Sequence, residues 1–371
     1  MEHAWIAGEP ATLEAAIAAA AELLASSRHP LIAGLGTDVA GARAAVALAQ
    51  RVGATIDHMH ADALLRNLDV MRSSGVVLTT PNEAQVRADT LLLVGPGLDG
   101  PWPELPRRLF GPVQTSQGDA NVARRIYCLC PGRGLAISAS GKTAGVAVGK
   151  QPAQLPALLA ALRARVAGRP IAVTHVSTRK LDEIATDLKG ARYGVAIWSA
   201  AALDALTIEM LCGLVDDLNA TTRFAGLALA PGDNAVGVMQ TCAWMTGMPM
   251  RSGFGRGSPH HDPWLFDARR LVASGEADCV VWISAYGAAP PAWRKAPPMI
   301  ALTDGGASFQ TAPRVHIRVG CPGVDHDGVA YLPSIGTLAL VEGKAPSEAI
   351  SAADAIARIA AILPAAGVKA C

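Results

Sequence analysis

The chain has 371 residues, enough for about two domains, because single hydrophobic cores stop growing at roughly 250–300 residues. A net charge of +1, a pI near 7.7 and only 4% aromatic residues give no signature of nucleic-acid binding. Hydrophobic residues make up 51% of the chain and the mean hydropathy is +0.28, yet no apolar run is long enough to span a membrane.

The amino-terminal residues 1–6 carry neither the basic region nor the apolar core of a secretory signal, so a cytoplasmic protein is expected. The seven cysteines are scattered, and we expect them to be reduced. A high apolar content with only 17% charged residues is typical of chains that bury surface against other subunits. We therefore expect part of this surface to form subunit interfaces.

The first part of the chain alternates between helical and extended patterns. The expected elements are a helix at 12–26 with Thr12 as its N-cap, a strand at 29–34, a helix at 41–52, strands at 54–56, 87–95 and 125–130, a helix at 152–166 and a strand at 170–174.

The alternation continues after a polar connection at 180–192. The expected elements are a strand at 194–198, a helix at 203–219, a strand at 225–230 and a carboxy-terminal helix that begins at the capping box Ser351–Asp354. Apolar strands joined by short helices predict parallel sheets that are covered on both faces.

Two segments of the chain echo each other. Residues 87–95 and 276–284 each place a charged residue and Ala-Asp, at Asp89 and Asp278, before an apolar strand. The echo is either ordinary punctuation between strands and helices or a sign of two related nucleotide-binding-like lobes.

A run rich in glycine and arginine, residues 234–257, is the most informative feature. Its five glycines surround Gln240, Arg251 and Arg256. Glycine allows a backbone to approach a ligand closely, and arginine recognises phosphate or carboxylate with a fork of donors. The run therefore predicts an anion-binding site.

Together with residues 258–263, this run resembles the pterin-binding stretch of the molybdopterin oxidoreductase superfamily, most closely that of the formylmethanofuran dehydrogenase B subunits. Asn234 and Gly237 match the Asn-x-x-Gly element of that family. Residues 34–57 resemble its first strand–helix–strand, and residues 320–331, with Asp325, Asp327 and Gly328, resemble a late segment.

The resemblance implies an α/β fold of two Rossmann-like lobes with mostly parallel sheets, lacking the family's amino-terminal Fe–S domain and its carboxy-terminal barrel. The first lobe would be discontinuous (1–60 plus 190–371) and the second inserted (61–189). The cofactor-binding positions, either a vestigial pterin site or a site for an anionic carrier, would be Asn234, Gly237, Gln240, Arg251 and Arg256.

The departures from the family pattern bear on function. Catalytic members begin with cysteines that hold a [4Fe-4S] cluster, whereas the first cysteine here is Cys128. Those members also carry a Mo or W ligand shortly after the aspartate that corresponds to Asp57, and Ala63, which has no donor atom, stands near that place. Redox chemistry and a bound metal are therefore not expected.

Members of the family without these groups occur in the formyltransferase/hydrolase complex of methylotrophic bacteria. That complex transfers formyl from a tetrahydromethanopterin-type carrier to a methanofuran-type carrier and releases formate. The resemblance implies a non-catalytic B subunit, whose partners would be an amidohydrolase-like A subunit, the C subunit and a formyltransferase D subunit. Arg251 and Arg256 would either bind the carrier's glutamates or satisfy loop carbonyls or an interface.

Two other functions fit parts of the sequence. In a metal-dependent hydrolase, His58 and His60 would share one face of a strand end, with His175 and Asp304 as further ligands. The other alternative is an active Mo- or W-pterin formylmethanofuran dehydrogenase.

Weaker motifs fail on spacing or side-chain geometry. Gly141-Lys-Thr143 lacks the glycine that a phosphate-binding loop needs at 136, and Gly34-Leu-Gly36 lacks one at 39. Neither nucleotide hydrolysis nor NAD binding is expected. Cys128 and Cys130 are expected to be buried on one face of a strand, and His260-His261 to lie in a polar loop.

Overall fold

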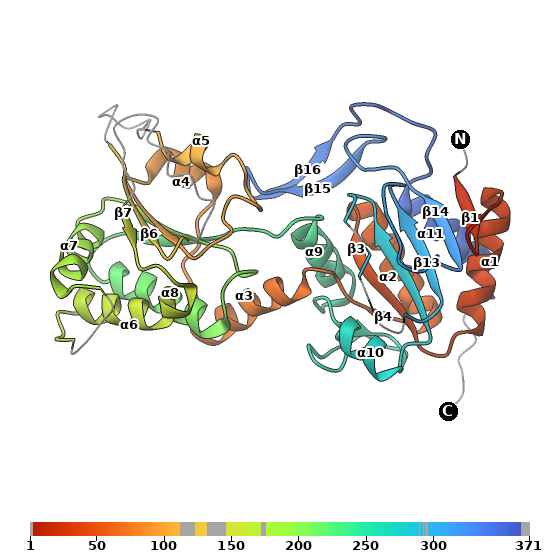
Figure 1. Cartoon of the computed structure of the whole chain (residues 1–371), viewed down its shortest axis with the longest axis horizontal. Coiled ribbons are helices and arrows are strands. Elements are labelled where there is room, and N and C mark those ends of the chain that lie inside the picture. Colours follow the sequence, from red (N-terminus) through yellow and green to blue (C-terminus); the bar gives the residue numbers. More distant parts are fainter. Residues whose placement is uncertain are drawn as a thin grey trace. The chain divides into compact units, whose positions relative to one another are not determined.

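The computed structural model describes residues 3–111, 123–131, 146–171, 176–288, 290–291, 293 and 296–364. The chain forms two compact units (Figure 1). Unit 1 comprises Met1–Ala61, Gly232–Tyr331 and Leu338–Cys371, and unit 2 comprises Asp62–Pro231 and Leu332–Thr337.

Unit 1 is built on a nine-stranded sheet in the order β11-β10-β4-β3-β12-β13-β14-β1-β2. Its five central strands are parallel, and the pairs at both edges are antiparallel. The strands are β1 (Ala4–Ile6), β2 (Glu9–Pro10), β3 (Pro30–Gly36), β4 (Thr55–Ile56), β10 (Ser252–Gly253), β11 (His260–His261), β12 (Cys279–Ser284), β13 (Met299–Thr303) and β14 (Val315–Arg318).

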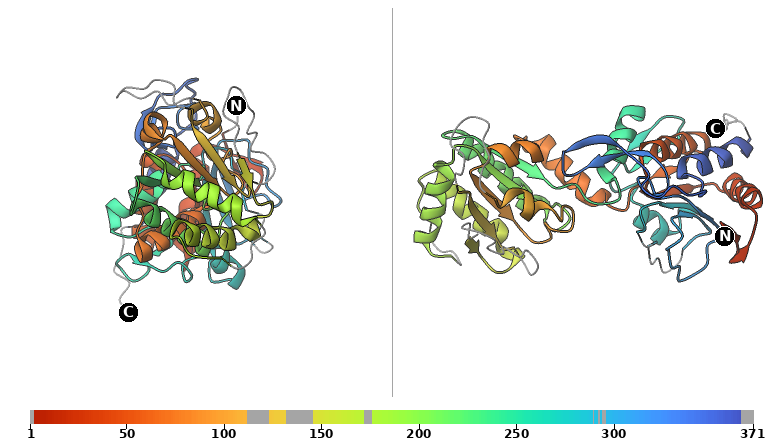
Figure 2. Two further views of the ribbon diagram at one scale, coloured as in Figure 1. Left: turned by 90° about the vertical axis from the view of Figure 1, so that its left-hand side faces the viewer. Right: turned by 90° about the horizontal axis from the view of Figure 1, so that it is seen from above.

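Among the described residues of unit 1, five helices accompany this sheet, and α11 packs against both α1 and α2 (Figure 2). The helices are α1 (Leu13–Ser26), α2 (Val39–Val52), α9 (Ala235–Thr246), α10 (Ala268–Ser274) and α11 (Ala352–Ile362). A separate two-stranded sheet consists of β15 (Gly328–Leu332) and β16 (Thr337–Val341). The predicted N-caps are confirmed, because the hydroxyls of Thr12 and Ser351 accept hydrogen bonds from Ala15 N and Asp354 N.

Unit 2 contains a five-stranded sheet, all parallel, in the order β7-β6-β5-β8-β9. The strands are β5 (Thr90–Val94), β6 (Arg125–Leu129), β7 (Val146–Val148), β8 (Gly194–Trp198) and β9 (Phe224–Ala228). The helices are α3 (Ala61–Ser74), α4 (Pro81–Arg87), α5 (Leu105–Leu109), the 3-10 turn η1 (Pro152–Gln154), α6 (Leu155–Val166), α7 (Thr178–Lys189) and α8 (Ala205–Asn219).

Two apolar clusters cover the two faces of this sheet, one with α6, α7 and α8 and the other with α4 and α5. The predicted mixed α/β fold with parallel sheets is thus confirmed. In the parts of the chain that the structure describes, no helix combines the length and apolar character needed to cross a membrane.

The structure corrects the expected boundary of the lobes. Residues 190–231, which the sequence assigned to the first lobe, belong to unit 2. The reason is strand pairing, since β8 lies between β5 and β9 in the sheet of unit 2.

The segment 180–192, expected to be a polar connection, lies mostly within helix α7. Ser177 caps this helix by accepting a hydrogen bond from Lys180 N, and apolar residues at helical spacing form its buried face. These buried residues are Leu181, Ile184, Ala185 and Leu188. The Gly141–Thr143 motif, His175 and most of the strand expected at 170–174 lie outside the described residues.

Cys128 and Cys130 are both buried, as predicted, but they do not share a face. Cys128 packs in the cluster with α4 and α5, whereas Cys130 packs in the other cluster. Strand β6 ends at Leu129, and Cys130 adopts a left-handed backbone with φ 47°, which turns its side chain away from strand alternation.

The repeated Ala-Asp segments perform the same structural task in both units. The Asp278 carboxylate accepts hydrogen bonds from Arg28 N at 2.8 Å and His29 N at 3.1 Å, directly before β3. The Asp89 carboxylate accepts one from Arg192 N at 2.9 Å, two residues before β8. Each aspartate precedes a strand that pairs in parallel with the strand whose start it binds.

Candidate functional site

The candidate site lies at the carboxyl ends of β3 and β4 in unit 1. Strand β3 pairs with β4 on one side and with β12 on the other, and the chain continues from β12 to β13 away from β3. The direction of winding therefore reverses between β3 and β12, which is where open parallel sheets form their ligand crevices.

Arg251, the first arginine of the glycine-rich run, is buried and is held by carboxylates of this chain. Its Nη2 lies 2.5 Å from Asp267 Oδ2, and its Nε lies 3.4 Å from Asp57 Oδ2. Its Nη1 donates a hydrogen bond to Pro263 O at 2.9 Å, and its side chain is only 9% exposed. The guanidinium therefore forms an internal link between the end of β4, the residue before β10 and the start of α10.

Asp57 is the most strongly perturbed acid of this network. Burial raises its pKa to about 7, although Arg251 and a hydrogen bond from Ala268 N oppose the shift. Because a single guanidinium serves both Asp57 and Asp267, the second negative charge is poorly compensated.

The Asn234 side chain forms hydrogen bonds with two other segments of unit 1. Its Nδ2 donates to Thr37 O at 2.8 Å, after β3, and its Oδ1 accepts from Tyr331 N at 2.8 Å, in β15. A Cβ atom at Gly237 would lie 2.2 Å from Asn234 Oδ1, so the Asn-x-x-Gly spacing leaves room for this side chain over the first turn of α9. Both ends of the Asn234 amide are therefore used internally.

His58 and His60 follow the carboxyl end of β4, in the same part of unit 1 as Asp57. His58 Nδ1 accepts a hydrogen bond from His60 N at 3.0 Å, so its Nε2 carries the proton that is donated to Asp233 O at 3.2 Å. Burial, and then the neighbouring His60, lower the pKa of His58 to about 4. His60 Nε2 lies 2.9 Å from Asp233 Oδ2.

This arrangement argues against the hydrolase alternative, because neither ring nitrogen of His58 has a lone pair left for a metal ion. Across the described residues, no group of three or more His, Cys, Asp or Glu side chains is placed to hold a metal ion. Asp304, named as a further ligand, instead accepts a hydrogen bond from Gly306 N at 3.0 Å.

The other residues predicted from the sequence, Arg256, Gln240, His260 and His261, lie in three different segments of unit 1. Arg256 is exposed in the turn after β10, and no hydrogen bond or ion pair joins it to the described part of the chain. Gln240 is half-buried on α9. His260 and His261 form β11 rather than a loop, and His261 Nδ1 donates to Arg251 O at 3.0 Å.

The residues at the pterin positions do not fit a bound Mo or W pterin. Ala63, near the expected metal ligand, is 6% exposed and belongs to an apolar cluster of unit 2. Arg251 and Asn234 are engaged as described. Sequence reasoning missed Asp233 and Asp267; only Asp267 carried a signal, as an N-cap before α10.

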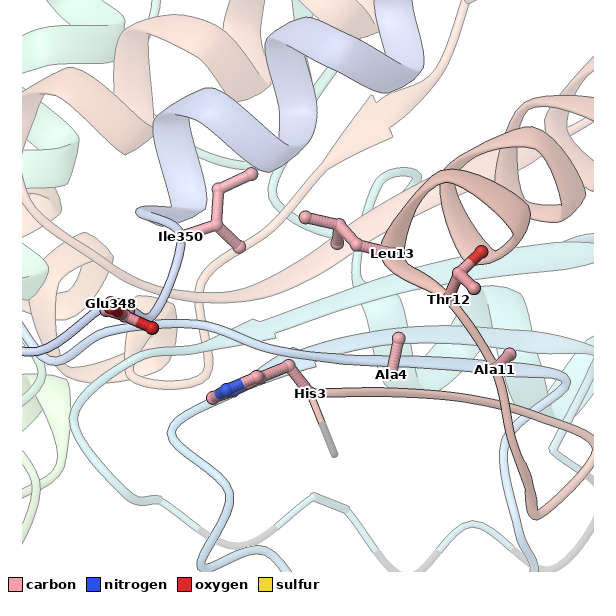
Figure 3. Close-up of a pocket in the computed structure, with 7 residues that line it drawn as sticks. All are labelled: His3, Ala4, Ala11, Thr12, Leu13, Glu348 and Ile350. Atoms are coloured by element: carbon pink, nitrogen blue, oxygen red, sulfur yellow. The ribbon is translucent and has the colours of Figure 1, made fainter. Parts of the chain in front are cut away.

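A pocket of about 280 Å³ lies toward the opposite edge of the same sheet, at β1 (Figure 3). It is lined by His3, Ala4, Ala11, Thr12, Leu13, Glu348 and Ile350. Its lining is mostly apolar, and it contains none of the predicted site residues.

Comparison with known proteins identifies the class of protein to which this chain belongs. No family model matches the chain. It is 28% identical to the B subunit of the tungsten-containing formylmethanofuran dehydrogenase 2 of Methanocaldococcus jannaschii, over 73% of this chain and 63% of that protein. It is 25% identical to the corresponding protein of Methanococcus maripaludis, over 72% of this chain and 63% of that protein. The chain is therefore a homologue of formylmethanofuran dehydrogenase B subunits.

A closer similarity is to the B subunit of the formyltransferase/hydrolase complex Fhc of Methylorubrum extorquens, at 34% identity over 96% of both chains. A chain of the crystal structure of that FhcABCD complex with methylofuran matches with a TM-score of 0.84 at 35% identity, covering 96% of this chain and 97% of that one. The chain belongs to the family of formyltransferase/hydrolase complex B subunits.

Proposed function

We propose that this chain is the non-catalytic B subunit of a formyltransferase/hydrolase complex. Its partners are an amidohydrolase-like A subunit, the C subunit and a formyltransferase D subunit. They pass formyl from a tetrahydromethanopterin-type carrier to a methanofuran-type carrier and release formate. Identity of 34% over nearly the whole chain supports this role, as does the assembly in which the matched structure was solved.

The single observation that carries the non-catalytic role is the Arg251 network. In an anion-binding site this guanidinium would point at a ligand, but here Asp57, Asp267 and Pro263 O hold it. The histidines and the asparagine beside it also bind other parts of the chain. The side chains that would have to bind a substrate thus form ion pairs and hydrogen bonds within the chain.

The carrier-binding part of the proposal rests on Arg256. It is exposed, and the described residues leave its guanidinium without a carboxylate partner. An exposed, permanently charged fork suits the carboxylates of a glutamate-bearing carrier. Arg256 is therefore the residue that we assign to carrier retention, whereas Arg251 is assigned to the internal network.

Omission of this chain from the complex tests the role directly. The three partner proteins would be co-expressed with and without this chain, and formate release and complex assembly would be measured. We expect the isolated chain to be inactive and the three partners to lose most of their assembly and activity without it. Full assembly and activity in its absence would contradict the proposal.

Charge reversal at each arginine separates their roles. Arg256→Glu is expected to lower retention of the carrier by the intact complex without changing the stability of this chain. Arg251→Glu is expected to destabilise the chain itself. Unchanged carrier retention in an assembled Arg256→Glu complex would remove the carrier role of Arg256 and leave the scaffold role intact.

A further inference from the structure

The chain passes between its two units at four places, which are called crossings below. They fall between residues 61 and 62, 231 and 232, 331 and 332, and 337 and 338. The last two crossings lie within the paired strands β15 and β16. The freedom of the backbone at the crossings limits how independently the two units can move.

Asp233 and Asn234, directly after the second crossing, have an unusual backbone. Both residues have φ of 55°, in the left-handed region. This conformation is unfavourable for residues other than glycine, and aspartate and asparagine adopt it mainly as single residues. Two consecutive left-handed residues persist only where the surrounding structure holds them.

Asp233 binds the segment that leads to the first crossing. Its Oδ2 lies 2.9 Å from Nε2 of His60, the penultimate residue of unit 1 before residue 62. Its carbonyl oxygen accepts a hydrogen bond from His58 Nε2 at 3.2 Å. The Asp233 side chain is only 15% exposed, so solvent screens its pair with His60 only partly.

Asn234 binds the segment that leads to the third crossing. Its Oδ1 accepts a hydrogen bond at 2.8 Å from the backbone N–H of Tyr331, the last residue of unit 1 before the chain crosses. Its Nδ2 donates to Thr37 O, directly after β3, which fixes the amide group. The fourth crossing is joined to the third because β16 pairs with β15. Two neighbouring residues of unit 1 thus bind the approaches to the crossings.

We propose that Asp233 and Asn234 form a locked hinge, called the 233–234 hinge below. Their side chains hold the approaches to the crossings, and loss of these contacts lets the left-handed backbone change its φ and ψ angles, so that unit 2 gains motion relative to unit 1. Hinges absorb such changes in a few residues at the ends of elements, and Asn234 is the N-cap residue of α9. The contacts all lie within the chain, so the inference does not depend on the proposed function.

Hydrogen–deuterium exchange of the full-length chain, followed by mass spectrometry, tests the hinge. We expect Asp233→Ala to raise the exchange rates of residues 60–64, 229–232 and 330–333 about tenfold, the effect of losing one hydrogen bond to a charged group. The amide of Tyr331 is the sharpest probe, because Asn234 binds it and Asp233 does not. The matched control is Asp278→Ala, which removes another carboxylate of unit 1 that binds distant backbone N–H groups but lies beside no crossing.

Asp233→Asn is the conservative variant. Asparagine tolerates the left-handed backbone, and its side-chain oxygen can still accept a hydrogen bond from His60, so exchange should stay within about twofold of the wild type. If Asp233→Ala does not fold, His60→Ala removes the same pair from the other side and carries the same expectation.

Three results would overturn the hinge. The first is exchange at all the crossings that is as slow in Asp233→Ala as in the wild type. The second is faster exchange confined to residues 58–60, because the loss would then be local and would not reach Tyr331. The third is an equal rise across the whole of unit 1 in Asp233→Ala and Asp278→Ala, which would report general destabilisation. None of these results bears on the scaffold role of the chain.

Discussion

The two units share a parallel-sheet plan but treat the carboxyl edge of the sheet differently. In unit 2 two positions of this edge are closely packed: a Cβ atom at Gly95, directly after β5, would lie 2.6 Å from Leu203 Cδ2, and one at Gly149, directly after β7, would lie 2.6 Å from Cys130 Sγ. In unit 1 polar side chains of Asn234, His58 and Arg251 occupy the corresponding edge.

This difference separates two ways of closing a ligand crevice. Parallel α/β sheets hold their ligands at the carboxyl edge, and here the chain's own side chains fill positions along that edge in both units. At Gly95 and Gly149 unit 2 does so by close packing, whereas unit 1 uses ion pairs and hydrogen bonds between residues far apart in sequence. The polar solution carries larger costs when a single partner is removed.

The largest effect is expected for Arg251→Met. Removal of the guanidinium leaves Asp57 and Asp267 in a buried site without a cation, so the free energy of unfolding should fall by about 3–5 kcal/mol. Denaturant unfolding followed by circular dichroism measures this change. Arg256→Met is the control and should change stability by less than about 0.5 kcal/mol. Equal effects of the two substitutions would show that the network contributes nothing.

The next effect is a pH dependence of the free energy of unfolding, to which two groups of unit 1 contribute with opposite signs. The raised pKa of Asp57 makes the free energy of unfolding fall as the pH rises from about 4 to about 7, because the folded state binds the extra proton. The lowered pKa of His58 makes it rise from about 4 to 6.5, because the unfolded state binds the extra proton there. The two slopes, each about 1.4 kcal/mol per pH unit, nearly cancel in the wild-type chain.

Single substitutions should expose each slope. Relative to the wild type, Asp57→Asn should gain stability with rising pH between about 4 and 6.5, and His58→Gln should lose it, by up to about 3 kcal/mol over the window. Urea unfolding at half-unit pH steps measures both. Three parallel stability curves would contradict the assigned protonation states.

A smaller effect is expected at the Asn234–Gly237 contact. Gly237→Ala pushes a methyl group against Asn234 Oδ1 and should cost about 2 kcal/mol through the lost hydrogen bonds to Thr37 and Tyr331. In an Asn234→Ala background the same substitution should stabilise the chain by up to about 1 kcal/mol, because alanine favours a helix more than glycine does. A sign that does not change between the two backgrounds would exclude the contact as the cause.

The smallest effect compares the repeated aspartates of the two units. Asp89→Ala and Asp278→Ala each remove a carboxylate that binds backbone N–H groups before a neighbouring strand, and each should cost about 1 kcal/mol. Asp278→Ala should cost more, because the Ser27 hydroxyl also donates to Asp278. Thermal unfolding of both variants measures which substitution lowers stability more. A larger loss of stability for Asp89→Ala than for Asp278→Ala would contradict this expectation.

Local signals in the sequence predicted much of the fold. The caps at Thr12 and Ser351 marked helix starts, and apolar runs marked β3, β5 and β8, because these depend on neighbouring residues alone. The sequence failed where a local pattern was ambiguous, as in the amphipathic helix α7. It also failed at the lobe boundary, because the pairing of β8 with β5 joins segments about a hundred residues apart.

The sequence identified residues of the candidate site but did not predict the partners that these residues bind. The run 234–257 identified Asn234 and Arg251, but their roles depend on partners that lie far away in the chain. Arg251 meets Asp57, 194 residues away, and Asn234 meets Thr37, 197 residues away. No spacing rule links such pairs, so only the folded chain shows that these side chains are engaged internally.

We propose that the side chains of Arg251, Asn234 and His58 hold unit 1 together and do not support a redox cofactor. The most direct test is elemental and pterin analysis of the complete complex, purified under mild conditions, alongside its formate release. We expect formate release without stoichiometric molybdenum or tungsten and without a pterin dinucleotide on this chain. A stoichiometric metal–pterin on this chain that turns over with formylmethanofuran would contradict it.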